Sequence, residues 1–199
     1  LDFARDTEAE VATMLRFFPT KLLSQKGGRR NLYPIMCLPY MWDNNTRYHN
    51  LKAKSFIPIF AVVAIELNLF DADERGGILV EDEDGVNTLS SLLVSTQSDN
   101  FRQRVDAGKL SVLVRLRQLG LFVKEDIQQY KLVNQLCRII DFVENIFHFL
   151  VQWDPSSLLI EDDEGHLPLH WAASNIQNRY CFRIVFESYI TYYPLKVGI

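Results

Sequence analysis

The stretch from Leu158 to Ala173 places the strongest constraint on how this chain can fold. A run of acidic residues leads into Gly165, which is free to adopt the positive φ of a tight turn. Pro168 then stands where the first turn of a helix needs no N–H. The small residues at 172–173 give that helix a face that another helix can approach closely. The stretch therefore predicts an acidic tight turn followed by a closely packed helix.

This turn has counterparts elsewhere in the chain. Residues 78–89 align without a gap on residues 158–169, with every position displaced by 80. The positions of the first copy that are identical in the second are Leu79, Glu81, Asp82, Gly85 and Leu89. A looser third copy places Asn31 on Gly165, and Asn is the residue that best replaces Gly at positive φ. Such recurrence is typical of repeat architectures.

Apolar residues recur at helical spacing in much of the chain. A capping box formed by Thr7 and Glu10 begins the first predicted helix, and Pro19 closes it. Asn68 and Gly120 are predicted to end two later helices as left-handed caps. The remaining helices are predicted over residues 55–67, 110–119, 125–136, 139–153 and 178–192, with a polar loop over 95–106 and an irregular insertion over 38–50.

The composition is typical of a globular protein and argues against some classes of binding partner. Of the 199 residues, 48% are hydrophobic and 12% are aromatic. A formal net charge of −4 does not favour a nucleic-acid binder, which would carry a basic stripe. The longest apolar run, residues 56–69, is too short for a bilayer, which needs about 20 apolar residues. We expect a monomer inside the cell, cytoplasmic or nuclear, that binds neither nucleic acid nor membrane.

No spacing in the sequence indicates catalysis or metal binding. Cys37, Cys137 and Cys181 lie far apart, which suggests neither a disulfide framework nor a zinc site. If Gly85 is set at the sixth position of an EF-hand loop, Val80 and Ser91 replace two essential oxygen ligands. Nucleophile-elbow, Walker, Rossmann and His-Glu-x-x-His motifs do not occur. We therefore expect no catalytic residue, no cofactor, no metal and no enzymatic activity.

Several short motifs carry a resemblance to a known family. They are Phe-Phe-Pro at 17–19, Ser-Phe-Ile-Pro at 55–58, Arg-Gly-Gly at 75–77, Glu-Asp-Glu-Asp-Gly at 81–85, Lys-Glu-Asp-Ile-Gln at 124–128, Trp-Asp-Pro-Ser-Ser-Leu at 153–158, Pro-Leu-His-Trp-Ala-Ala at 168–173 and Tyr-Tyr-Pro at 192–194. Over nearly its whole length the sequence resembles a large, divergent ankyrin-repeat-like family that is expanded in unicellular algae of the diatom type.

This resemblance implies an all-α fold, an ankyrin-like α-solenoid of stacked helix pairs with irregular long loops. It implies one domain over residues 1–199, taken as a fragment of a longer array, with a leading helix at 1–19 and units at 20–70, 71–122, 123–153 and 154–199. Leu167 departs from the pattern, because a regular repeat has Thr there. We expect His170 to play a structural part by bonding its ring to the turn backbone.

Ankyrin-like repeats imply protein binding, so the expected function is that of a non-catalytic interaction scaffold whose protein partner is unknown. The alternative is a regulatory module that binds a phosphorylated or anionic ligand through the basic loop 21–30. That loop can also be solvated and without a ligand, and aromatic residues in the 38–50 insertion can pack against its own helices. The candidate partner-binding residues are Lys26, Arg29, Arg30, Tyr40, Trp42, His166 and Trp171.

Overall fold

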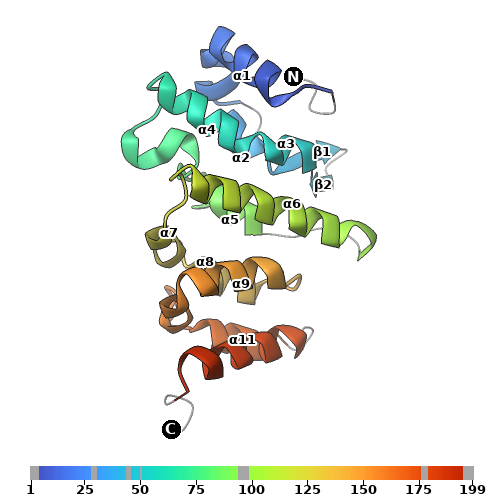
Figure 1. Cartoon of the computed structure of the whole chain (residues 1–199), viewed down its shortest axis with the longest axis vertical. Helices are drawn as coiled ribbons and strands as arrows, with labels where there is room; N and C mark the ends of the chain where they lie inside the picture. Colours follow the sequence, from blue (N-terminus) through green and yellow to red (C-terminus); the bar gives the residue numbers. More distant parts are fainter. Residues whose placement is uncertain are drawn as a thin grey trace. The chain divides into compact units, whose positions relative to one another are not determined.

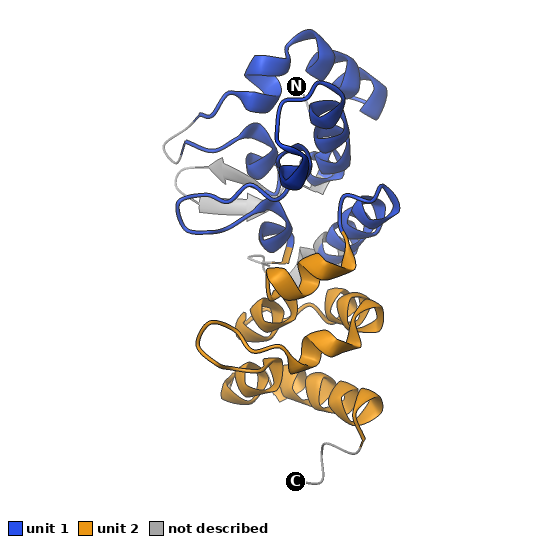
Figure 2. Cartoon of the chain, turned by 90° about the vertical axis from the view of Figure 1, so that its left-hand side faces the viewer, with its two compact units in different colours: residues 1–92, 96–122 blue, residues 93–95, 123–199 orange. Residues whose placement is uncertain are grey.

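The computed structural model describes residues 5–27, 31–43, 46–49, 51–93, 99–175 and 179–194 (Figure 1). The chain divides into two compact units (Figure 2). Unit 1 comprises Leu1–Leu92 with Thr96–Phe122, and unit 2 comprises Leu93–Ser95 with Val123–Ile199. Helices dominate the described residues of both units, so the prediction of an all-α class is confirmed.

Unit 1 is built around one apolar helix, as the sequence predicts. Its elements are α1 (Glu8–Phe17), η1 (Thr20–Ser24), α2 (Pro34–Cys37), β1 (Tyr40–Asp43), β2 (Thr46–His49), α3 (Leu51–Ser55), α4 (Ile57–Glu66), η2 (Ala72–Gly77), α5 (Thr88–Leu93) and α6 (Asp99–Gln118). Helix α4 packs against α1, α2, α3, α6 and η2. It buries residues on several sides, including Ile57, Phe60, Val63 and Ala64, and so forms the centre of the core.

The predicted caps of unit 1 are confirmed. At the start of α1, Thr7 N–H donates to Glu10 Oε2 at 2.7 Å, and Glu10 N–H donates to Thr7 Oγ1 at 3.3 Å. Asn68 and Gly120 adopt φ of 51° and 70° after α4 and α6. Each cap lets the next N–H reach back to a helix carbonyl, as in the bond of Leu69 N–H to Ala64 O at 3.0 Å.

The prediction of a polar loop over 95–106 is wrong for its described part. Helix α6 begins at Asp99 and continues to Gln118. The polar residues Asp106 and Lys109 are buried, and their carboxylate and ammonium lie 3.5 Å apart. Because these charged groups are next to one another inside the unit, polar composition does not mark a loop here.

The insertion predicted over 38–50 contains an antiparallel hairpin, in which Tyr40 pairs with His49 and Trp42 with Arg47. Helix α3 follows it directly. The hairpin was not predicted, because the alternation that marks a strand is too short in this segment to distinguish from a loop.

Unit 2 consists of α7 (Lys124–Gln129), α8 (Leu132–Arg138), α9 (Glu144–Trp153), η3 (Pro155–Leu159), α10 (Pro168–Ser174) and α11 (Arg179–Tyr192). Helix α8 packs against α7, α9 and α10, and α10 packs against α11. The predicted C-terminal helix over 178–192 is confirmed for its described residues. The helix predicted over 139–153 begins only at Glu144.

The single helix predicted over 125–136 is wrong, because Lys131 takes a left-handed conformation with φ of 49° between α7 and α8. In one continuous helix Ile127 would lie on the face opposite Leu132, Val133 and Leu136. All four of these side chains are buried. The break turns both apolar faces toward the core.

Candidate functional site: the acidic turns and the pocket beside the first

Two acidic turns have the same hydrogen bonds. We call residues 81–86 the first acidic turn and residues 161–166 the second acidic turn. In each, the Oδ1 of the aspartate, Asp82 or Asp162, accepts the backbone N–H groups two and four residues further on, at 3.0 and 2.9 Å. Gly85 and Gly165 adopt the predicted positive φ, 73° and 76°. The match at a displacement of 80 therefore corresponds to one turn formed twice.

The second acidic turn is completed by a tryptophan from the helix that follows it. Trp171 on α10 donates its Nε1–H to Asp162 Oδ2 at 2.5 Å. Partial burial would raise the pKa of the Asp162 carboxyl, but donation from His166 N–H, Trp171 Nε1–H and Glu164 N–H holds it below its ordinary value. The carboxylate thus joins the turn to the helix.

Cations from α8 also meet the second acidic turn. The guanidinium of Arg138 lies 4.7 Å from the centre of the Trp171 ring, and on the same indole the His166 ring centre lies at 4.9 Å. Arg138 also lies 3.6 Å from Glu164, and Lys131 forms an ion pair with Asp163. His166 and Trp171, two of the predicted partner-binding residues, therefore lie together in a cluster of acids, cations and one aromatic ring.

His170 has the structural part expected of it. Its Nδ1 accepts the N–H of Leu167 at 3.1 Å, which satisfies a donor at the start of α10. The hydrocarbon side chain of Leu167 cannot accept an N–H of the first turn, so the imidazole provides only the reciprocal bond of a capping box, the one to the N-cap N–H.

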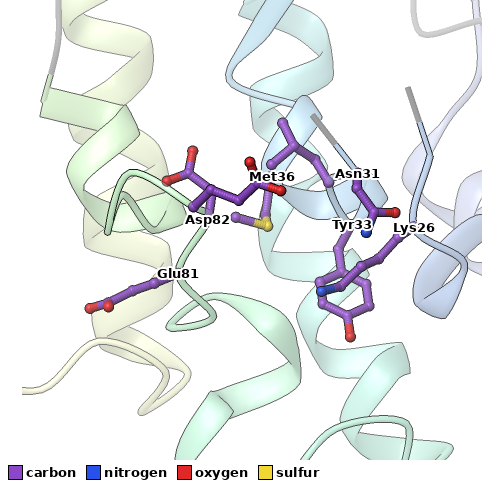
Figure 3. A pocket seen from close by; sticks show the side chains of 8 residues that line it. Lys26, Asn31, Tyr33, Met36, Glu81 and Asp82 are labelled. Atoms are coloured by element: carbon purple, nitrogen blue, oxygen red, sulfur yellow. The ribbon is translucent and has the colours of Figure 1, made fainter. Parts of the chain in front are cut away.

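A pocket of about 230 Å³ lies in unit 1 beside the first acidic turn (Figure 3). Its lining residues are Lys26, Asn31, Leu32, Tyr33, Met36, Glu81, Asp82 and Glu83. Figure 3 shows Lys26 and Tyr33 next to each other on one side, with Asp82 on the other and Met36 between. The side chain of Glu81 points away from Tyr33.

The backbone before α2 sets the position of the Tyr33 wall. Gly27 and Leu32 exchange two backbone hydrogen bonds of 3.0 Å, and Asn31 takes the predicted positive φ, 50°. Tyr33 is the N-cap of α2, and its ring packs edge-on against Phe70 at 5.0 Å. These contacts hold the ring, and the Lys26 ammonium lies 4.8 Å from its centre.

The predicted site residues do not form a single cluster. Lys26 lines the pocket in unit 1, whereas His166 lies in the second acidic turn and Trp171 contacts it from α10, both in unit 2. Tyr40 and Trp42 are described as backbone of β1 only, and Arg29 and Arg30 lie outside the described residues.

Three residues that line the pocket or contact the second acidic turn were not predicted from the sequence, namely Tyr33, Glu83 and Arg138. The alignment at a displacement of 80 does indicate the first acidic turn. The same alignment places Ser91 at the position that Trp171 has in the second copy. No signal singled out Tyr33, because its place opposite residues 81–83 depends on folding.

Searches for a metal site and for a membrane span gave no candidate within the described ranges. There, no group of three or more His, Cys, Asp and Glu side chains is placed to hold a metal ion. In the same residues, no helix is both long and apolar enough to cross a bilayer.

A comparison with protein-family models found no match, and comparisons with curated proteins and with solved structures found none either.

Proposed function

We propose that this protein is a non-catalytic protein-binding scaffold of the ankyrin-repeat type, in which each acidic turn and the helix after it offer a partner-binding surface. The observation that carries the proposal is the repetition of one turn, with the same hydrogen bonds, before α5 and again before α10. A unit that recurs in this way is the building block of a repeat protein.

The order of elements supports a solenoid of stacked helix pairs. A short helix, a turn, an inner helix and an outer helix follow one another in unit 2 as η3, the second acidic turn, α10 and α11. Helix α8 precedes α9 in the same way, and α8 packs directly on α10. In solenoids each repeat contacts its neighbours, and inner helices lie side by side.

The chemistry of the second acidic turn supports partner binding there. Tryptophan and arginine are the residue types that most often dominate interface energies. The side chain of Arg138 is 60% exposed while it stacks on Trp171. Because Asp162 already holds the turn and the indole in place, a partner would meet a surface that loses little conformational entropy on binding.

The alternative of an anionic ligand at the basic loop receives no support from the pocket beside it. Asp82 and Glu83 line this pocket together with Lys26, and their negative charge would repel a phosphate. We therefore propose no second function, and a role for the other cations of residues 21–30 stays a prediction.

The proposal is tested with immobilised protein and a cell extract, using two arginines in matched settings. Arg138 is 60% exposed and stacks on Trp171, and Arg183 is 61% exposed and stacks on Tyr180. We expect Arg138→Gln to weaken capture of a specific partner about tenfold and Arg183→Gln to leave it unchanged. Circular dichroism checks that both variants are folded. Absence of any specifically captured protein, or equal capture by both variants, contradicts the proposal.

A further inference from the structure

We infer that the pocket beside the first acidic turn binds a basic side chain of the partner protein, arginine in preference to lysine. The inference rests on the proposed function and names the partner chemistry that this site would recognise. It is carried by the difference between the two acidic turns, which share their backbone but not their neighbours.

The second acidic turn shows what fills the space beside such a turn. Trp171 donates to the aspartate Oδ2, and Lys131, the N-cap of α8, reaches Asp163. Arg138 stacks on the indole and faces Glu164. The cations that this turn requires are supplied by the chain itself.

Two acids of the first acidic turn, Asp82 and Glu83, lack counterparts of these groups among the described residues. At a displacement of 80, Ser91 replaces Trp171 and Glu83 replaces Asp163. Tyr33 is the N-cap of α2, as Lys131 is the N-cap of α8, so an aromatic residue stands where the second acidic turn has a cation. Within the described part of the chain no donor faces Asp82 Oδ2 and no cation pairs with Glu83. The pocket, which Lys26 also lines, lies beside these two carboxylates.

The size of the pocket suits a single side chain. Pockets that hold small molecules usually measure about 300–1,000 Å³. The volume here is about 230 Å³. A side chain entering from a partner fits this volume better than a cofactor.

The residues that line the pocket favour a cation with a planar group. Lys26 lies over the Tyr33 ring, which demonstrates that this ring face accepts a cation. Lys26 is exposed at the surface, so an incoming cation can displace it. A guanidinium stacks on an aromatic ring and donates to carboxylates with its fork at the same time, whereas an ammonium is a point charge. Arginine thus matches Tyr33, Asp82 and Glu83 together.

The binding test uses nuclear magnetic resonance on the isotope-labelled full chain. The probes are blocked tripeptides Gly-Arg-Gly, Gly-Lys-Gly and Gly-Cit-Gly, where citrulline has the shape of arginine without its charge. We expect saturable shifts of the amides at 31–36 and 82–86 with the arginine peptide, with a Kd on the order of 1 mM. Lysine should bind more weakly and citrulline should not bind. Absence of saturable shifts, or equal shifts at 162–166, overturns the inference.

Two variants at the pocket and one control on the second acidic turn test whether the peptide binds at the pocket. Glu83→Gln should weaken the arginine peptide about tenfold, since it removes one charge-assisted bond. Glu161→Gln makes the same charge change on the second acidic turn and should leave the Kd unchanged. Lys26→Met should tighten binding about threefold, because the ring face becomes free. Equal effects of Glu83→Gln and Glu161→Gln overturn the inference.

The same variants separate this inference from the proposed function. If Arg138→Gln abolishes partner capture and Glu83→Gln does not weaken it, the scaffold function stands and the arginine pocket is wrong. If the peptide binds at the pocket while the full chain captures no protein specifically, the pocket stands as a guanidinium site and the scaffold function is wrong.

Discussion

Two lysines lie inside unit 1, where α3 packs against α6. Lys54 is 1% exposed and Lys109 is 0% exposed. Burial, with the positive charge of Lys109 adding to it, lowers the pKa of Lys54 to about 6, although Asp106 acts in the opposite direction. At neutral pH Lys54 is therefore mostly uncharged, and the stability of unit 1 depends on keeping it so.

This burial predicts a pH dependence with a definite sign. Between the folded pKa of about 6 and the ordinary value of 10.5, the unfolded chain binds more protons at Lys54. Stability then rises with pH, by up to about 1.4 kcal/mol per pH unit, and is lowest below the folded pKa. Urea unfolding between pH 6.5 and 9 measures the slope. We expect Lys54→Met to reduce the slope and to stabilise the protein at pH 7 by about 1–4 kcal/mol.

Exposed Lys52 on the same helix provides the control for this prediction. Lys52→Met should leave the pH slope as it is in the native chain. Equal slopes for the native chain and Lys54→Met would contradict the assignment of the pH dependence to Lys54.

At the scale of elements, the contact between α4 and η2 depends on a glycine. Gly76 has φ of 68°, and a Cβ added there would lie 2.3 Å from the carbonyl oxygen of Ala61 on α4. Only a residue without a side chain allows η2 to approach α4 this closely. The motif Arg-Gly-Gly at 75–77 thus has a packing reason in unit 1.

Substitution at this contact should be costly. We expect Gly76→Ala to destabilise the protein by roughly 2–4 kcal/mol, since it adds a steric clash to the strain of positive φ. Gly120 has φ of 70° with nothing within 4 Å of an added Cβ, so Gly120→Ala should cost only about 1 kcal/mol. Chemical denaturation measures both values. Equal losses would show that the approach to Ala61 is not limiting.

Some elements follow from local chemistry and others do not. The turn at Gly165 and the caps at Asn68 and Gly120 were predictable, because each depends on one residue type that tolerates positive φ. The break at Lys131 was not, because lysine carries no local preference for that conformation. Here packing of Ile127 and Leu132 on a common core overrides the helical pattern.

At the scale of the whole molecule, the chain consists of two compact units, each with buried apolar residues of its own. In a repeat protein, stability is approximately a sum of unit terms and nearest-neighbour terms. Under the proposed repeat architecture, a defect introduced in one unit should remain largely local.

Hydrogen exchange on the Gly76→Ala variant tests this locality. We expect faster amide exchange in α4, which contacts η2, and a much smaller change in α10 and α11 of unit 2. The fold-change in exchange rate of each helix is the measurement. The same fold-change in both units would mean that the chain unfolds as a single cooperative body, in conflict with a repeat architecture.

Some residues of the candidate site were singled out by their residue type alone. Lys26 stood out as part of a concentration of positive charge, and His166 and Trp171 belonged to the best-preserved turn. Their contact residues belong to other parts of the chain: Lys26 contacts Tyr33, and Trp171 contacts Arg138. Pair contacts of this kind have no signature in one sequence.

Helix caps, acidic turns and the all-α class were determined by residue chemistry within a few positions, because one side chain or one glycine satisfies each backbone requirement locally. Long-range packing alone decided that Asp106 and Lys109, one turn apart on α6, are buried, and that the pocket forms between Lys26, residues 31–33, Met36 and residues 81–83. Both depend on segments that only the folded chain packs against one another, and their free energies arise from desolvation and contact.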